Sequence, residues 1–230
     1  MIRELIDLIR NGDWASFFME MAAIALIVFV CFPVHECAHA WMAMKQGDQT
    51  ARLKGRLTLN PMAHLDLIGS IMILLVGFGY AKPVPVNPNN LKNGKKSFAL
   101  VALAGPVSNI IMAFIALILL NIWAVVYDHT QAINETLFAV LAVFFRYAAT
   151  INIGLAIFNL IPIPPLDGSR ILTLVLPEKY YFKIMEYERY IMIGVFALIF
   201  FGVLDWPLQK LTALVYQGLG FVAGLPFRWL

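Results

Sequence analysis

The chain is poor in charged residues and in cysteine. Asp, Glu, Lys and Arg make up only 13% of its 230 residues, against 61% hydrophobic residues, whereas a soluble domain is about one quarter charged. The net charge of +3 is small, and no block of basic residues alternates with aromatic ones, so nothing indicates a nucleic-acid partner. Cys31 and Cys37 form neither a disulfide framework nor a CxxC pair. This composition excludes an ordinary soluble domain and indicates a protein of the lipid bilayer.

Long apolar runs predict an all-α polytopic membrane protein. The runs at 17–44, 98–126, 136–161 and 190–205 approach or exceed the roughly 20 residues that cross a bilayer, and a weaker run follows at 208–225. The run LIGSIMILLVGFG after the first of these is too short, at about 1.5 Å per residue, to cross about 30 Å. We therefore expect a bundle of about five to six transmembrane helices, with a short re-entrant or β-like segment after the first helix.

No internal repeat or long low-complexity linker divides the sequence, so residues 1–230 are expected to form a single domain. Residues 1–14 place apolar side chains at helical spacing among charged ones, which predicts an interfacial amphipathic helix. No cleavage site follows, so we expect the first span to be retained. Residues 206–230 are expected to form a weak last span or an interfacial segment. The stretch AKPVPVNPNNLKNGKK favours extended backbone, as a loop or an edge strand.

Basic residues are distributed unevenly between the predicted loops. Lys and Arg follow the first long run, precede the second and lie between the third and fourth, whereas YDHTQAINE has none. By the positive-inside rule, the three basic loops face the cytoplasm, provided that the short run enters and leaves on one side. We therefore expect an integral membrane protein with these loops on its cytoplasmic side.

Three ionisable residues interrupt the first apolar run, in the motif VHECAH. On a helix, His35 and His39 stand on one face and could bind one metal ion, with Glu36 beside it as a general base. The alternative is a pair of core histidines bonded to nearby carbonyls. Each ionisable group at the centre of a membrane helix costs roughly 2.5 to 3.5 kcal/mol. That cost favours the metal site, because an ion would organise all three side chains.

A catalytic zinc ion takes three protein ligands and keeps one open position. His129 lies on the wrong side by the count of basic residues. His64 in NPMAHLDLIG and Asp167 in PPLDGSR both lie near the basic side. Spacing alone leaves these two candidates open. His64 could instead solvate or cap its loop, or act near the site as a gate.

Further polar residues occur in the apolar runs. Asn152 and Asn159, seven positions apart, share a helix face, which suits either interhelical hydrogen bonding or substrate contact. Counting residues along their helices places Glu20 and Arg146 at similar depths in the membrane. They would either form an ion pair or extend separately to the outer interface.

At three places the sequence resembles the site-2 protease family of intramembrane zinc metalloproteases. The matching stretches are His35 to Ala40, Ala104 to Asn109 and Asn159 to Gly168, in the family's order and with its wide separation. GRLTLNPMAHLDLIGSI and AKPVPVNP resemble the compact prokaryotic branch that lacks PDZ and CBS domains. The resemblance covers about residues 30–175. Ser169 and Leu67 depart from common family residues, which leaves fine loop geometry open.

This resemblance implies a zinc-dependent endopeptidase with Zn²⁺ held by His35, His39 and Asp167 and with Glu36 as the catalytic base. Asn159 matches an asparagine expected to contact substrate. The implied substrates are single-pass membrane proteins cleaved in or near their transmembrane segments. The resemblance also implies a prokaryotic cytoplasmic membrane, with the active site toward the cytoplasm. The substrate's identity, the cleavage position and any regulatory partner are not implied. Other functions compatible with the residues are a metal-binding membrane transporter and a protease-like adaptor that does not cut.

Overall fold

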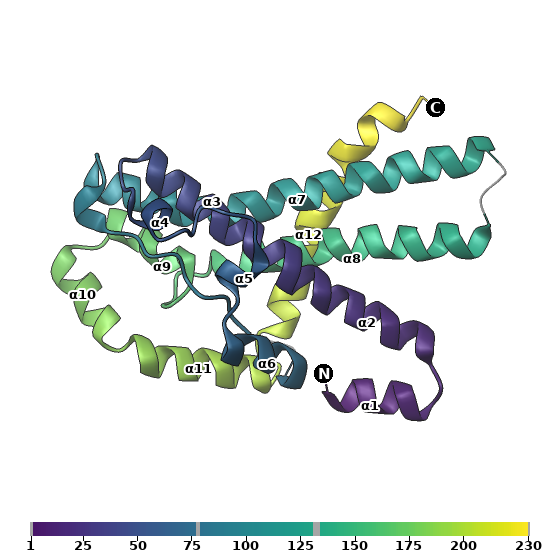
Figure 1. Ribbon diagram of the computed structural model, residues 1–230, viewed down its shortest axis with the longest axis horizontal. Coiled ribbons are helices and arrows are strands. Elements are labelled where there is room, and N and C mark those ends of the chain that lie inside the picture. The colour runs from purple at the N-terminus through teal and green to yellow at the C-terminus, as the bar shows by residue number, and fades with distance from the viewer. Residues whose placement is uncertain (1, 77–78, 131–133, 230) are drawn as a thin grey trace.

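The computed structural model describes residues 2–76, 79–130 and 134–229, and the chain is helical through most of them (Figure 1). The first apolar run forms one continuous helical rod, Trp14–Lys45. It consists of α2 (Trp14–Leu26), a π-helical turn η1 (Ile27–Cys31) and α3 (Phe32–Lys45). Pro33 has no backbone N–H, and the Phe32 N–H bonds to the Ile27 carbonyl. The chain therefore passes the proline without breaking the rod, just before the HECAH motif.

Two further long helices form an antiparallel pair, α7 (Gly94–Thr130) and α8 (Glu135–Asn159), against which α3 packs (Figure 1). Shorter helices complete the described chain. They are α1 (Ile2–Arg10), α4 (Thr50–Leu53), α5 (Pro61–His64), α6 (Leu67–Val76), η2 (Pro88–Asn90), α9 (Asp167–Ile171), η3 (Leu172–Leu174), α10 (Glu178–Glu186), α11 (Glu188–Phe200), α12 (Asp205–Gly224) and η4 (Leu225–Phe227).

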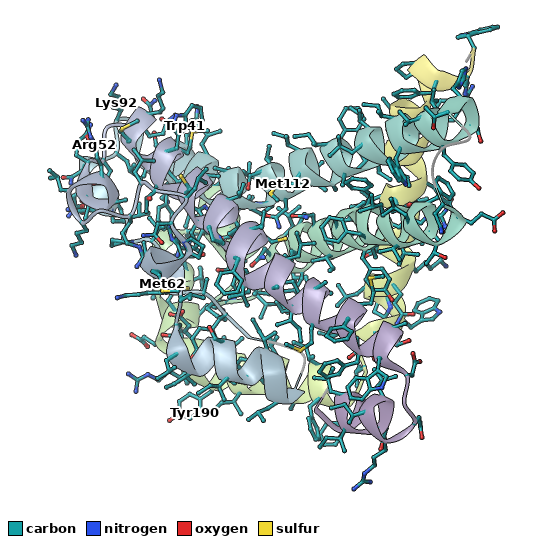
Figure 2. The ribbon with its side chains drawn as sticks, turned by 45° about the vertical axis from the view of Figure 1, so that its right-hand side comes forward. Trp41, Arg52, Met62, Lys92, Met112 and Tyr190 are labelled. Atoms are coloured by element: carbon teal, nitrogen blue, oxygen red, sulfur yellow. The ribbon has the colours of Figure 1, made fainter. Side chains whose placement is uncertain are left out.

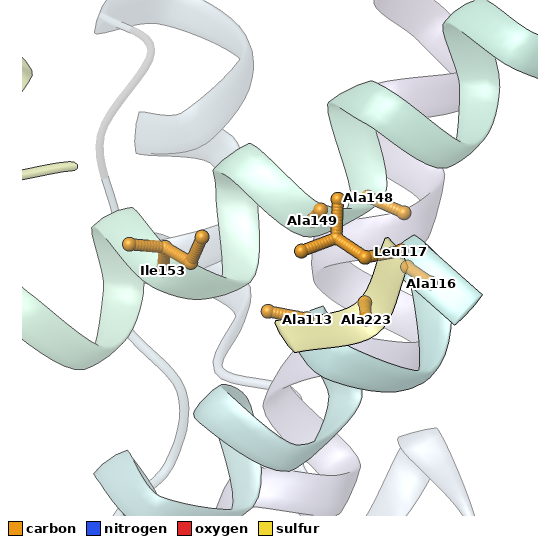
Figure 3. Close-up of a cluster of buried hydrophobic side chains, with 7 residues drawn as sticks. All are labelled: Ala113, Ala116, Leu117, Ala148, Ala149, Ile153 and Ala223. Carbon is orange, nitrogen blue, oxygen red and sulfur yellow. The ribbon is translucent and has the colours of Figure 1, made fainter. Parts of the chain in front are cut away.

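Small residues line the interface where α7, α8 and α12 meet. The buried cluster contains Ala113, Ala116, Leu117, Ala148, Ala149, Ile153 and Ala223 (Figure 3). Alanines allow helix backbones to approach closely, which provides van der Waals contact where lipid removes the hydrophobic driving force. This interface fixes α8, and with it the start of the loop that leads to Asp167, relative to α7.

The outer helix surfaces are apolar, as expected for a lipid environment. Ile111, Ile115 and Leu119, spaced by four residues on α7, are 54%, 49% and 42% exposed. Three described helices are long and apolar enough to cross a membrane, namely Trp14–Lys45, Gly94–Thr130 and Glu135–Asn159. These features support an integral membrane protein.

The count of five to six spans is not confirmed. The run predicted to span at 190–205 is helical only to Phe200, and α11 meets α12 at an angle of 81°. Gly202 lies at the break with φ +70°, a backbone conformation that favours glycine. If this bent pair is one broken span, the described residues contain up to four spans.

The expectation of a β-like segment after the first helix is wrong, because the described residues contain no strand. The short apolar run instead forms α6, and residues 80–87 follow as irregular backbone before η2. The Lys82 N–H donates to the His64 carbonyl at 2.8 Å, so the chain returns after α6 to its starting point. Residues 77–78 lie outside the described chain.

Candidate metal centre

Three side chains converge where α3, α7 and α9 meet. The Nε2 atoms of His35 and His39 are 3.0 Å apart, and each is 3.1 Å from Oδ2 of Asp167. All three residues are buried, at 8%, 5% and 8% exposure. The structure thus brings together the motif histidines and one of the two candidates for a third ligand.

The outer ring nitrogens of both histidines are held by α7. His35 Nδ1 lies 2.8 Å from the side-chain Oδ1 of Asn109, and His39 Nδ1 lies 2.7 Å from the Val101 carbonyl. Both partners are acceptors, so each Nδ1 donates its hydrogen and each neutral ring directs the lone pair of Nε2 inward. With both rings neutral, two lone pairs and a carboxylate oxygen face one another at about 3 Å, an arrangement that a bound cation would stabilise.

Zinc fits this donor set. Donor atoms separated by 3.0–3.1 Å can all reach one ion at the usual distances of about 2.0–2.2 Å. Ligating histidines in metalloproteins typically donate their other ring N–H to a carbonyl or carboxylate, as these two do to oxygen acceptors. Among the described residues, this is the one group of three or more His, Cys, Asp or Glu side chains able to hold an ion.

Gly105 of α7 permits the two imidazoles to lie against that helix. A Cβ added at Gly105 would lie 2.4 Å from His39 Nε2 and 2.6 Å from His35 Nε2. Both distances are far below van der Waals contact, so any larger residue would displace the histidines.

Asp167 is the first residue of α9 and reaches the histidines from beyond the end of α8. The next residue, Gly168, packs on α8, where an added Cβ would lie 2.2 Å from the Leu160 carbonyl oxygen. The Oδ2 atom of Asp167 lies 3.1 Å from Nε2 of each histidine, so its carboxyl group completes the donor set.

Glu36 is half-buried and lines a cavity of about 380 Å³ beside the three donors. Its Oε2 accepts a hydrogen bond of 3.0 Å from the Val84 N–H. The cavity is also lined by residues 79–81, by Asn159 and by Phe196 of α11. The Asn159 amide nitrogen donates to its own helix, at the Leu155 carbonyl.

Residues 80–87 are tied to the protein at several points along the cavity. The Arg56 guanidinium donates to the carbonyls of Lys82 and Pro83. Asp48 accepts the Asn87 N–H at 2.7 Å from beyond the end of α3. This segment of irregular backbone is therefore held against the general-base candidate.

The structure decides between alternatives at two places. His64 is 1% exposed, and its Nε2 bonds to the Thr58 carbonyl at 2.8 Å, which fits a residue that caps its own loop. It lies outside the group of three donors. Glu20 and Arg146 form no ion pair, since Glu20 Oε2 is buried without a hydrogen-bond partner and Arg146 is exposed.

Comparison with known proteins identifies the family. The model of peptidase family M50 matches residues 22–202. The chain belongs to peptidase family M50. This is the site-2 protease family, and the match spans the HECAH motif, the α7 contacts and Asp167.

Curated relatives agree with this assignment. "Putative zinc metalloprotease YwhC" of Bacillus subtilis is 41% identical over 192 residues, covering 82% of this chain and 86% of the relative. MJ0611 of Methanocaldococcus jannaschii, with the same description, is 29% identical over 178 residues, covering 74% and 83%. Rip2 of Mycolicibacterium smegmatis, also so described, is 27% identical over 167 residues, covering 70% and 59%. No solved structure matches significantly.

The protein is therefore a zinc metalloendopeptidase of family M50 rather than a transporter or an adaptor. The sequence had indicated the metal-binding motif, but it had not indicated the roles of Asn109, Val101 and Gly105. Gly105 and Asn109 belong to the GPVSN motif on α7, which the resemblance included. Glycine has no side chain, however, and the spacing of Asn109 gave no reason to expect a contact with His35.

Proposed function

We propose that His35, His39 and Asp167 hold the zinc ion and that Glu36 is the general base of an intramembrane endopeptidase. The proposed substrates are single-pass membrane proteins, cut in or near their transmembrane segments in regulated intramembrane proteolysis. The observation that carries the proposal is the donor group, which joins two histidines of the first membrane span to Asp167 of α9 and lines a cavity of about 380 Å³ with Glu36 at its wall.

Bound zinc polarises a scissile carbonyl and acidifies water. Glu36 then has the role of accepting a proton from the attacking water and delivering it to the leaving amine. Its half-buried carboxylate suits this role, because it faces the cavity and is not one of the three converging donors. In the resting protein the carboxylate is engaged by the Val84 N–H, so we expect that bond to loosen when substrate and water enter.

A transmembrane helix hides its carbonyl groups in internal hydrogen bonds, so the substrate must unwind before it can be cut. Gly79, Tyr80, Ala81, Pro83 and Val84 border the cavity, and Arg56 and Asp48 hold this part of the chain in place. Backbone that is free of regular structure can pair with an unwound peptide. We propose that this segment guides the substrate and that Asn159, which also lines the cavity, contacts it.

We propose that the site faces the cytoplasm and that α6 is re-entrant. Arg52, Lys92 and Trp41 lie at one end of the molecule, where α3 ends and α7 begins (Figure 2). Basic residues prefer the cytoplasmic side. The bond between Lys82 N–H and the His64 carbonyl joins the two ends of the α6 excursion, as expected of a segment that enters and leaves on one side. We further propose that residues 1–230 act as one domain.

The test is cleavage of single-pass reporter proteins by the purified protein in lipid nanodiscs, comparing wild type with Glu36→Gln. Glu20→Gln is a matched control, because it alters a second carboxylate of the same helical rod, outside the cavity lining. We expect Glu36→Gln to retain zinc and lose cutting, while Glu20→Gln retains both. Cutting by Glu36→Gln at the wild-type rate would refute the role of Glu36. Failure of wild type to cut membrane reporters while it cuts soluble peptides would refute the substrate class.

A further inference from the structure

A chain of buried side-chain amides leads away from His35. His35 Nδ1 contacts Asn109 Oδ1 at 2.8 Å, and Asn109 Nδ2 donates to Asn152 Oδ1 at 3.3 Å. Asn152 Nδ2 then donates to the Ala148 carbonyl at 2.9 Å. Asn109 and Asn152 are 0% and 1% exposed. The chain crosses three helices, from α3 through α7 to α8, and ends on a backbone carbonyl that has a fixed direction.

The direction of each amide is decided by its neighbour. An asparagine side chain presents an acceptor at one end and a donor at the other, and it can turn over to exchange them. The Ala148 carbonyl accepts only, so Asn152 must direct its nitrogen there and its oxygen toward Asn109. Asn109 must then direct its nitrogen toward Asn152 and its oxygen toward His35.

The consequence reaches the metal-binding face of His35. With Asn109 Oδ1 toward it, Nδ1 carries the hydrogen and Nε2 presents a lone pair to the other donors. A reversed Asn109 would present N–H to Nδ1 and favour the tautomer whose hydrogen sits on Nε2, which opposes metal binding. His39 needs no such chain, because its Nδ1 donates to the Val101 backbone carbonyl, which cannot reverse.

We propose that Asn152 is a positioning residue for the zinc site, acting through Asn109 to hold His35 in its metal-binding tautomer. Asn152 contributes no atom to the group of three donors. The proposal concerns metal binding alone and does not depend on the substrate class proposed above.

The experiment measures zinc affinity by chelator competition for the full-length protein in detergent. Asn152→Leu removes the acceptor for Asn109 at similar side-chain size. Asn152→Asp is the conservative variant, because a protonated carboxyl retains an acceptor and a donor. Asn121→Leu is the matched control: the Asn121 amide also donates within its own membrane helix, to the Leu117 carbonyl of α7, but belongs to no chain leading to a histidine. Asn152→Ala serves the same test if the leucine variant fails to fold.

Loss of an outer partner of a metal-binding histidine typically weakens metal affinity 10-fold to 100-fold. We expect about a tenfold loss for Asn152→Leu, and near wild-type affinity for Asn152→Asp and Asn121→Leu. In an Asn109→Leu background, Asn152→Leu should cause no further loss, because the connection is already broken. The absorption spectrum of the Co²⁺-loaded protein should change for Asn152→Leu and not for Asn121→Leu.

Two results would overturn the proposal. One is wild-type zinc affinity in folded Asn152→Leu or Asn152→Ala. The other is an undiminished further loss when Asn152→Leu is added to Asn109→Leu, which would mean that Asn152 does not act through Asn109. Monodisperse elution and the thermal transition of each variant separate a change in zinc affinity from general loss of fold.

Discussion

Replacing Gly105 with alanine should weaken zinc binding, although the change adds a single methyl group. The added Cβ would lie 2.4 Å from His39 Nε2 and 2.6 Å from His35 Nε2 and Cε1. Ordinary contact needs roughly 1 Å more. Either α3 and α7 separate by about that distance, or the imidazoles rotate away from the Asn109 side chain and the Val101 carbonyl that hold them.

Both routes have a calculable cost. Overpacking a close interface costs about 1 to 3 kcal/mol, and leaving a buried hydrogen-bonding group unpaired also costs about 1 to 3 kcal/mol. Either cost alone corresponds to a loss of zinc affinity between roughly 5-fold and 150-fold. Even a partial displacement matters, because metal–ligand distances tolerate only about 0.2 Å.

The assay is chelator competition for Gly105→Ala beside Gly154→Ala. Gly154 lies in the membrane helix α8, and a Cβ added there meets no atom within 4 Å. We expect Gly154→Ala to bind zinc as the wild type does. Wild-type zinc affinity in a folded Gly105→Ala protein would refute the close approach of α7 to the histidines.

Three further predictions concern the surroundings of the site. Gly168→Ala should lower zinc occupancy, because the Cβ would meet the Leu160 carbonyl oxygen at 2.2 Å and push α9 away; metal analysis checks this. Proteolytic cleavage within residues 80–87 should be faster in Arg56→Ala than in Arg52→Ala. Arg56 is 7% exposed and donates hydrogen bonds to that segment, whereas Arg52 is exposed. Burial raises the pKa of Asp48, but its bonds to Thr50, Asn87 and Asn90 lower it below 3.8. The folded-state pKa is thus depressed, so its contribution to stability is present above about pH 4 and is lost as pH falls further. Unfolding measured from pH 3 to 7 should show less acid destabilisation for Asp48→Asn than for wild type.

The zinc motif can be predicted from the sequence because its geometry depends only on local helical structure. His35, Glu36 and His39 acquire their geometry from the helix alone, whatever surrounds it. The remaining donor and the supporting contacts depend on tertiary packing. Asp167 and His64 could not be separated by spacing, since their positions depend on where α9 and α5 lie relative to α3. Gly105 lies at the imidazoles only because α7 packs on α3 in one register.

The errors have similar causes. Residues 190–205 read as one apolar span, but a left-handed glycine at 202 and the 81° bend divide the segment, and both are properties of the backbone. The ion pair between Glu20 and Arg146 was considered because both lie at a similar depth in the membrane. Depth alone does not show in which direction each helix points its side chains. The sequence left His64 open between a ligand, a loop cap and a gate, because it does not show that the chain returns after α6 and covers this residue.

The most direct test of the zinc site compares bound metal in Asp167→Ala and His64→Ala with that in wild type, using mass spectrometry of the purified protein. We predict one zinc ion per chain in wild type and in His64→Ala, and loss of zinc in Asp167→Ala. Retention of zinc by Asp167→Ala together with its loss from His64→Ala would contradict the proposed ligand set.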